Sequence, residues 1–162
     1  AAISRLAVRQ DIRAAISASA PLVERLVAMI PDPHATGALA VLGQWNHAAA
    51  AFTAAVSSHS AAAMSACVRM LASMPQDRLE AFLTEDAATR IGAICDSLRS
   101  APAPDASLVV PALHVLSVAA LVDVFRALLV ERLGEDALDS LATSLPQLRD
   151  EFAHLSSVIG SP

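Results

Sequence analysis

Apolar residues recur every three or four positions along most of this chain, which is the spacing of one face of an α-helix. The pattern begins over residues 3–16, where isoleucine and leucine mark one side and arginine another. A second stripe covers residues 21–30, with a proline at its start, where a helix tolerates the missing N–H. No run of alternating β-branched residues is long enough to indicate a strand. The pattern therefore predicts an all-α fold.

The third expected helix has two possible ends. It carries Leu39 and Leu42, and either stops near residues 43–46 or continues through the alanines toward Phe52. The serines within residues 57–60 offer N-caps for the helix that follows, because their hydroxyl oxygens can accept bonds from the first free N–H groups.

Helix-breaking and capping residues divide the rest of the chain. Pro75 is expected to interrupt the pattern, and residues 84–87 (Thr-Glu-Asp-Ala) to start a new helix with a hydroxyl cap and two acids in its first turn. One long apolar helix is expected over residues 108–133. Gly134 follows at the position where a left-handed residue commonly ends a helix.

Residues 101–106, Ala-Pro-Ala-Pro-Asp-Ala, form the clearest linker, because two prolines in this spacing do not continue a helix. We expect a single all-α domain over residues 1–162, in which this linker separates two helical halves, 1–100 and 107–162. The full length is that of one domain and is sufficient to bury a core without disulfide or metal support.

Composition and charge exclude a disordered chain and argue against nucleic-acid partners and a membrane span. The chain is 55% hydrophobic, 17% charged and 3% aromatic, which excludes an extended disordered chain. Its net charge of −5 repels a phosphate backbone, so no nucleic-acid partner is expected without a concentrated basic face. No membrane span is expected either, because charges interrupt the most apolar stretch at Asp123 and Arg126.

Cysteine usage and the start of the chain bear on location. Cys67 and Cys95 lie far apart without a CxxC motif, and are read as small buried apolar side chains rather than a disulfide. This favours a reducing, cytoplasmic location. The chain starts without Met and enters the helical pattern at once, so we expect a cut boundary and missing targeting segments.

One helix–break–helix unit resembles an armadillo repeat. Residues 21–27 (PLVERLV) are followed by a proline break and residues 38–44 (ALAVLGQ), as in a family whose LVxLL-like helix precedes one ending in an ALGN-like turn. Residues 91–94 (IGAI) echo the same turn about one long repeat later, and the two echoes cover a third of the chain. The resemblance implies helical hairpins stacked as a short armadillo- or HEAT-like α-solenoid. A compact helical bundle is the alternative.

The resemblance does not extend to the family's peptide-binding ladder of Trp and Asn. Ala40 and Gln44 occupy those positions in the first echo, and Thr89 and Ala93 in the second. Trp45 is offset by one residue, which turns it by about 100° on a helix. Binding of basic localisation peptides is therefore not implied.

Motifs for chemistry are missing from the sequence. The histidines are scattered without metal-ligand spacing, no GxSxG surrounds a serine, and the glycines are isolated. The acids near residues 131–139 are read as a hydrated helix junction. We therefore expect no metal, no cofactor and no enzyme.

The candidate binding residues are an arginine row and two aromatic side chains. Arg5, Arg9 and Arg13 recur at i, i+4 and i+8, and such a row suits an acidic partner segment, acids elsewhere in the chain, or solvent. Trp45 and Phe52 would anchor a partner if exposed.

Together these patterns predict a non-enzymatic interaction or scaffold module, a fragment of a larger helical protein, that binds another protein through a helix-lined surface. Self-association is also allowed. The alternative is a helical bundle holding a small apolar ligand in an Ala/Met/Leu-lined pocket. The methionines that would line this ligand pocket are Met29, Met64, Met70 and Met74. An enzyme whose catalytic residues converge from distant positions is a third class.

Overall fold

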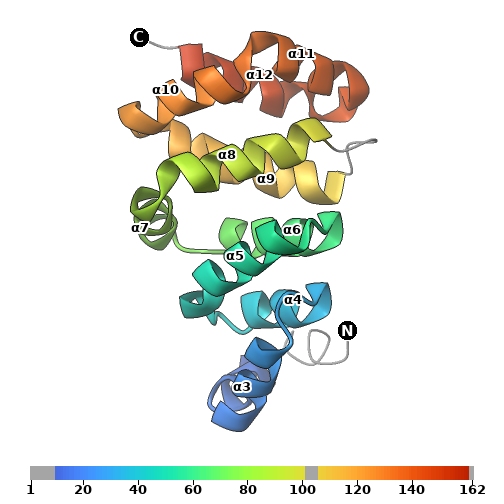
Figure 1. Cartoon of the computed structure of the whole chain (residues 1–162), viewed down its shortest axis with the longest axis vertical. Coiled ribbons are helices and arrows are strands. Elements are labelled where there is room, and N and C mark those ends of the chain that lie inside the picture. Colours follow the sequence, from blue (N-terminus) through green and yellow to red (C-terminus); the bar gives the residue numbers. More distant parts are fainter. Residues whose placement is uncertain (1–9, 101–105, 161–162) are drawn as a thin grey trace. The chain divides into compact units, whose positions relative to one another are not determined.

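The computed structural model describes residues 10–100 and 106–160, and these residues form helices and their connecting turns without a strand (Figure 1). The all-α prediction is confirmed. The contacts divide the chain into two compact units, unit 1 (Ala1–Met74) and unit 2 (Pro75–Pro162). Unit 1 contains α2 (Gln10–Ser17), α3 (Ala20–Ala28), α4 (Pro33–Val41), the 3-10 turn η1 (Trp45–His47), α5 (Ala48–Ser58) and α6 (Ala61–Ala72). Unit 2 contains α7 (Gln76–Glu85), α8 (Ala87–Ser100), α9 (Ala106–Ala120), α10 (Asp123–Arg132), α11 (Gly134–Ser144), the turn η2 (Pro146–Leu148) and α12 (Arg149–Gly160).

The start and end of α4 are set by local sequence. Asp32 is the N-cap, and its Oδ1 accepts bonds from the backbone N–H of His34 at 3.0 Å and of Ala35 at 2.9 Å. At the other end Gly43 takes φ +72°, and the N–H of Gln44 donates to the carbonyl of Leu39 at 2.9 Å. This left-handed glycine closes the helix as a Schellman motif does. The third helix therefore stops before residues 43–46, as the first alternative expected.

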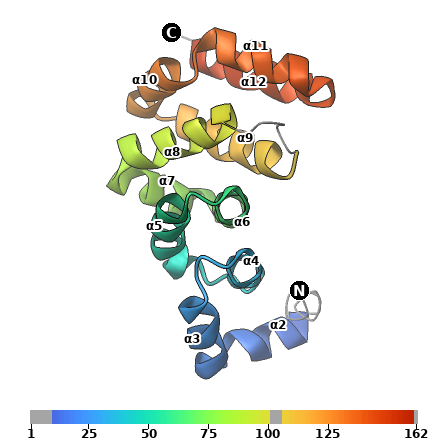
Figure 2. The same cartoon turned by 45° about the vertical axis from the view of Figure 1, so that its right-hand side comes forward.

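The core of unit 1 is built on small side chains. Its helix α6 packs against both α4 and α5, and Figure 2 shows α4 and α6 nearly end-on beside each other. Alanines let the helix backbones approach closely, and Leu39, Met70 and Leu71 fill the space between them. The buried alanines are Ala35, Ala38, Ala48, Ala51, Ala55, Ala63 and Ala66.

Unit 2 has a core of larger side chains. Helix α8 packs on α10, and α9 on α12, with α7 and α11 completing the packing. The side chains fully removed from solvent include Leu79, Leu83, Ile91, Ile94, Leu98, Leu116, Leu129 and Leu155.

Two helix boundaries in unit 2 differ from expectation. Thr84 does not start a helix: it lies inside α7, where its Oγ1 donates to the carbonyl of Glu80 at 2.8 Å, and α8 begins three residues later. The long helix expected over residues 108–133 is broken, because Val122 takes an extended conformation (φ −104°, ψ 118°) between α9 and α10. Gly134 does follow α10 with φ +63°, as expected.

The expected linker does not coincide with the division between the units. Residues 101–105 lie outside the described residues, and α8 and α9 on either side of them pack against each other within unit 2. The division falls instead at Met74 and Pro75. Among the described helices none is both long and apolar enough to cross a bilayer.

Candidate functional site

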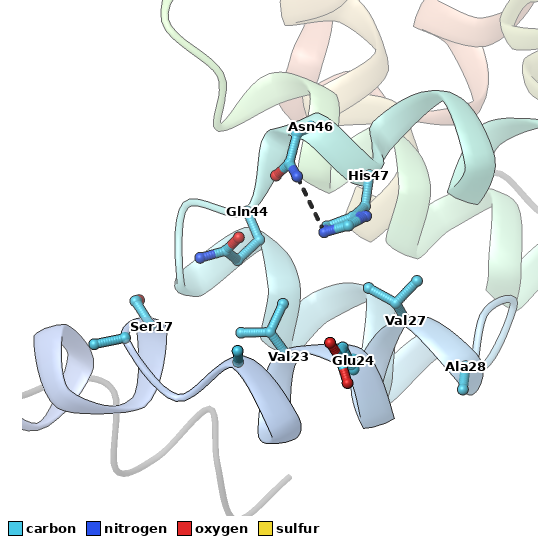
Figure 3. Close-up of a pocket in the computed structure, with 10 residues that line it drawn as sticks. Ser17, Val23, Glu24, Val27, Ala28, Gln44, Asn46 and His47 are labelled. Carbon is cyan, nitrogen blue, oxygen red and sulfur yellow. Dashed lines mark hydrogen bonds between the residues drawn. The ribbon is translucent and has the colours of Figure 1, made fainter.

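An open groove in unit 1 is a candidate site in the described part of the chain. It lies between α3 and the segment 44–47, with the end of α2 closing one side, and its volume is about 490 Å³ (Figure 3). One wall is apolar and the other polar, so the groove can offer different contacts to the two sides of a bound chain.

The apolar wall is one face of α3. Ala20, Val23 and Val27 follow the three- and four-residue spacing that places side chains on the same side of a helix. Figure 3 shows Val23 and Val27 pointing from α3 toward the opposite segment, and both are only half-buried. Glu24 lies on the same stretch of α3 with an exposed carboxylate, the single formal charge among the lining residues.

The polar wall carries Gln44, Asn46 and His47. The Nδ2 of Asn46 lies 3.1 Å from the Nε2 of His47 (Figure 3). An amide carries N–H donors and a carbonyl acceptor, and a neutral imidazole ring carries one donor and one acceptor. The wall therefore offers ring and amide N–H donors together with two side-chain carbonyl acceptors, a set that matches the donors and acceptors of a peptide backbone.

Three contacts hold this polar segment and the turn before it in place. The Oγ of Ser17, at the end of α2, donates to the carbonyl of Leu42 at 3.1 Å. The indole Nε1 of Trp45 donates to the Oγ of Ser73, just after α6, at 3.3 Å. A Cβ added to Gly43 would lie 3.7 Å from the Trp45 ring, so the ring covers the turn that ends α4. These contacts preorganise the segment.

The structure describes one member of the arginine row. Arg13 is exposed, and its guanidinium donates to the carbonyl of Val41 at 3.4 Å, at the C-terminal end of α4. A cation at this end of a helix interacts favourably with the free carbonyls. Within the chain Arg13 thus bonds to a backbone carbonyl, whereas the sequence suggested acids as its intrachain partners. Arg5 and Arg9 lie outside the described residues.

The two aromatic candidates differ in their surroundings. Phe52 is only 3% exposed, so it belongs to the core of unit 1 and does not meet the exposure condition for an anchor. Phe52 is buried because α5 packs against α6. The sequence pattern alone did not show which helix would cover this side of α5. Trp45 is half-buried, held by Ser73, and lies between the groove residues Gln44 and Asn46.

A second groove lies between α11 and α12 in unit 2, with a volume of about 510 Å³. Its lining includes Leu138 and Phe152 at the base and the charged Asp139 and Arg149, which are exposed. Neither groove is lined by a methionine. Met64, Met70 and Met74 are buried in unit 1, whereas Met29 is exposed.

The cysteines are buried and free. Burial raises the pKa of the Cys67 thiol from 9.0 to about 12, and burial followed by the nearby Asp96 raises that of Cys95 to about 12. Thiols with such pKa values are poor nucleophiles and poor ligands near neutral pH. In the part of the chain that the structure describes, no three His, Cys, Asp or Glu side chains are grouped to hold a metal ion.

The sequence analysis did not predict a binding role for the groove residues Glu24, Gln44, Asn46 and His47, although it placed Gln44 at a position of the armadillo peptide-binding ladder. The sequence did contain a feature that could have pointed to a site. The run Gln-Trp-Asn-His, with three polar side chains, follows a helix-ending glycine and lies between two alanine-rich helices. The sequence did not show that α3 would lie opposite this run, since that depends on how α3 and α4 pack.

No protein-family model, curated protein sequence or solved structure matches this chain, and the armadillo-like resemblance stays a prediction.

Proposed function

We propose that this chain is a non-enzymatic interaction module that binds a segment of another protein in the groove of unit 1. The groove with its apolar α3 wall and its hydrogen-bonding wall at Gln44, Asn46 and His47 carries this proposal. An open site with both kinds of contact suits a peptide segment, whose side chains and backbone need different partners.

The dimensions support a short extended segment. Helix α3 has nine residues and is therefore about 13.5 Å long. An extended chain advances about 3.3 Å per residue, so roughly four residues fit along the apolar wall. Side chains on one side of the segment would pack on Val23 and Val27, while its backbone would pair with the amides of Gln44 and Asn46.

Two finer expectations belong to this proposal. An acidic segment of the partner would engage the arginine row of Arg5, Arg9 and Arg13, of which the structure describes Arg13 on α2. A cytoplasmic location rests on the free, buried thiols of Cys67 and Cys95, which need no oxidising compartment.

The test is affinity capture followed by binding of the purified partner. Wild-type chain and a Val27→Glu variant are compared with Met29→Glu, which makes the same charge change at an exposed position that does not line the groove. We expect Val27→Glu to weaken the partner's affinity by more than about tenfold, because a carboxylate would be placed on the apolar wall.

Met29→Glu should bind like the wild type, and circular dichroism should show the same helix content for all three proteins. Equal losses in both variants, or no loss in Val27→Glu, would show that the groove is not the binding site. Asn46→Ala, at an exposed position, tests the polar wall without placing a charge in it.

A further inference from the structure

Helix α10 in unit 2 exposes two large apolar side chains, and the turn before it exposes a third. Val124 is 71% exposed and Val130 52%, and Leu121, in the turn before the helix, is 59% exposed. Single exposed apolar residues are ordinary on protein surfaces, so the case for an interaction surface depends on how the two valines are arranged with the charged residues of the same helix. The opposite side of α10 already supplies Phe125 and Leu129 to the core, so the valines are not needed there.

The exposed face of α10 has a definite arrangement. Each helical residue turns by about 100°, so Val124 and Glu131, seven positions apart, lie on one edge of the face. Asp123 and Val130, also seven apart, lie on the other edge, and Ala127 lies between the edges near the middle; all of these side chains are exposed. The two valines thus occupy one diagonal of the face and the two acids the other, with a small methyl group at the crossing.

The acids remain accessible for a partner. The carboxylate of Asp123 forms an ion pair with Arg126, with 3.3 Å between Oδ1 and Nη2, yet the Asp123 side chain is 91% exposed. The Nε of Arg126 also donates to the carbonyl of Ala120 at 3.2 Å, which ties this guanidinium to the end of α9. An exposed ion pair of this kind is weak, and a carboxylate has room for a second donor.

We propose that this α10 face binds an amphipathic helix of another protein that carries Lys or Arg beside its apolar stripe. The partner's apolar side chains would cover Val124 and Val130, and its cations would reach Asp123 and Glu131. Ala127 allows a second helix to approach closely, because no long side chain separates the two backbones. The net charge of −5 favours encounter with a basic partner.

A second copy of this chain fits the face poorly. If the face pairs with itself about a two-fold axis, either the acids meet acids or each acid meets a valine. The first arrangement places like charges together, and the second covers each carboxylate with an apolar side chain. A basic helix avoids both costs. This site lies in the other unit from the groove, so the inference does not depend on the function proposed above.

The test uses the full chain and two synthetic helical peptides of 14 residues, one made of Leu, Ala and Lys and its twin with Glu in place of Lys. Binding is measured by fluorescence anisotropy at low and high salt. Val124→Ser and Glu131→Lys alter the face. Val110→Ser on α9 and Asp77→Lys on α7 are the controls, because the first makes the same substitution and the second the same change of charge at another exposed position of unit 2.

We expect the Lys peptide to bind and the Glu twin to bind at least about tenfold more weakly, with affinity falling as salt rises. Glu131→Lys and Val124→Ser should each weaken the Lys peptide about threefold to tenfold beyond their controls. Equal binding of both peptides, or losses no larger than in Asp77→Lys and Val110→Ser, would overturn the proposal. So would a dimer in analytical ultracentrifugation that Val124→Ser abolishes, since the occupant would then be a second copy.

Discussion

The two units of this protein pack their helices in different ways. Unit 1 brings α4, α5 and α6 together through buried alanines, whereas unit 2 fills its interior with leucine, isoleucine and phenylalanine. In a contact lined by alanine, the damaging substitution is one that introduces a larger side chain. In a core filled by leucine, the damaging substitution is one that removes a large side chain and leaves a cavity. One all-α chain thus contains two kinds of helix packing.

The surfaces of the units differ as well. In unit 1 a helix faces a polar turn and the space between them is a groove, which suits an extended segment. In unit 2 the α10 face is a helix surface with valines and acids on its diagonals, which suits another helix.

The largest effect is expected from emptying the core of unit 2. Leu116 is fully buried in α9, so Leu116→Ala should lower the free energy of unfolding by about 2–5 kcal/mol through lost burial and a cavity. The matched control Leu121→Ala, at a 59% exposed position, should change it by about 0.5 kcal/mol or less. Urea unfolding followed by circular dichroism measures both, and similar losses would contradict the view that Leu116 is a core residue.

A pH effect is expected from the two buried thiols, one in each unit. An unfolded thiol loses its proton above its ordinary pKa of 9.0, whereas Cys67 and Cys95 keep theirs in the folded protein to about pH 12. Between these values the folded state binds more protons, so the free energy of unfolding falls as pH rises, by about 1.4 kcal/mol per pH unit for each thiol.

Unfolding measured from pH 9 to 11 checks this, and Cys67→Ala or Cys95→Ala should each remove about half of the thiol contribution to the slope. An unchanged slope in the double variant would show that the thiols do not cause it. The native protein should also resist thiol-modifying reagents at pH 8, because both groups are buried and protonated.

A smaller effect is expected from overfilling unit 1. Ala51 is 1% exposed in α5, so Ala51→Leu should destabilise the protein by about 1–3 kcal/mol, because the neighbouring helices must move to admit the larger side chain. Ala50→Leu, at the exposed neighbouring position, should be nearly neutral. The chain's single tryptophan, Trp45, lies in unit 1, so its fluorescence reports this unit's unfolding. A neutral Ala51→Leu would mean that the alanine contacts are loose.

Several features of the fold could be read from local sequence because their causes are local. Gly43 and Gly134 end helices through backbone conformations that glycine adopts without strain, and Pro75 interrupts the pattern wherever the rest of the chain lies. The break at Val122 could not be read in this way. Nothing in the run of apolar residues around it forbids a helix, and the extended conformation goes with the packing of α9 and α10 against each other.

The sequence by itself determined the all-α class, most helices and the burial of the two cysteines, because helical periodicity and hydrophobicity act over a few residues. The tertiary structure decided that Phe52 is core, that Arg13 bonds to the end of α4, and that Gln44, Asn46 and His47 face α3. It also decided that Val124 and Val130 remain outside. Each of these outcomes depends on which helices meet, and helices meet through contacts between residues distant in the chain, which periodicity does not specify.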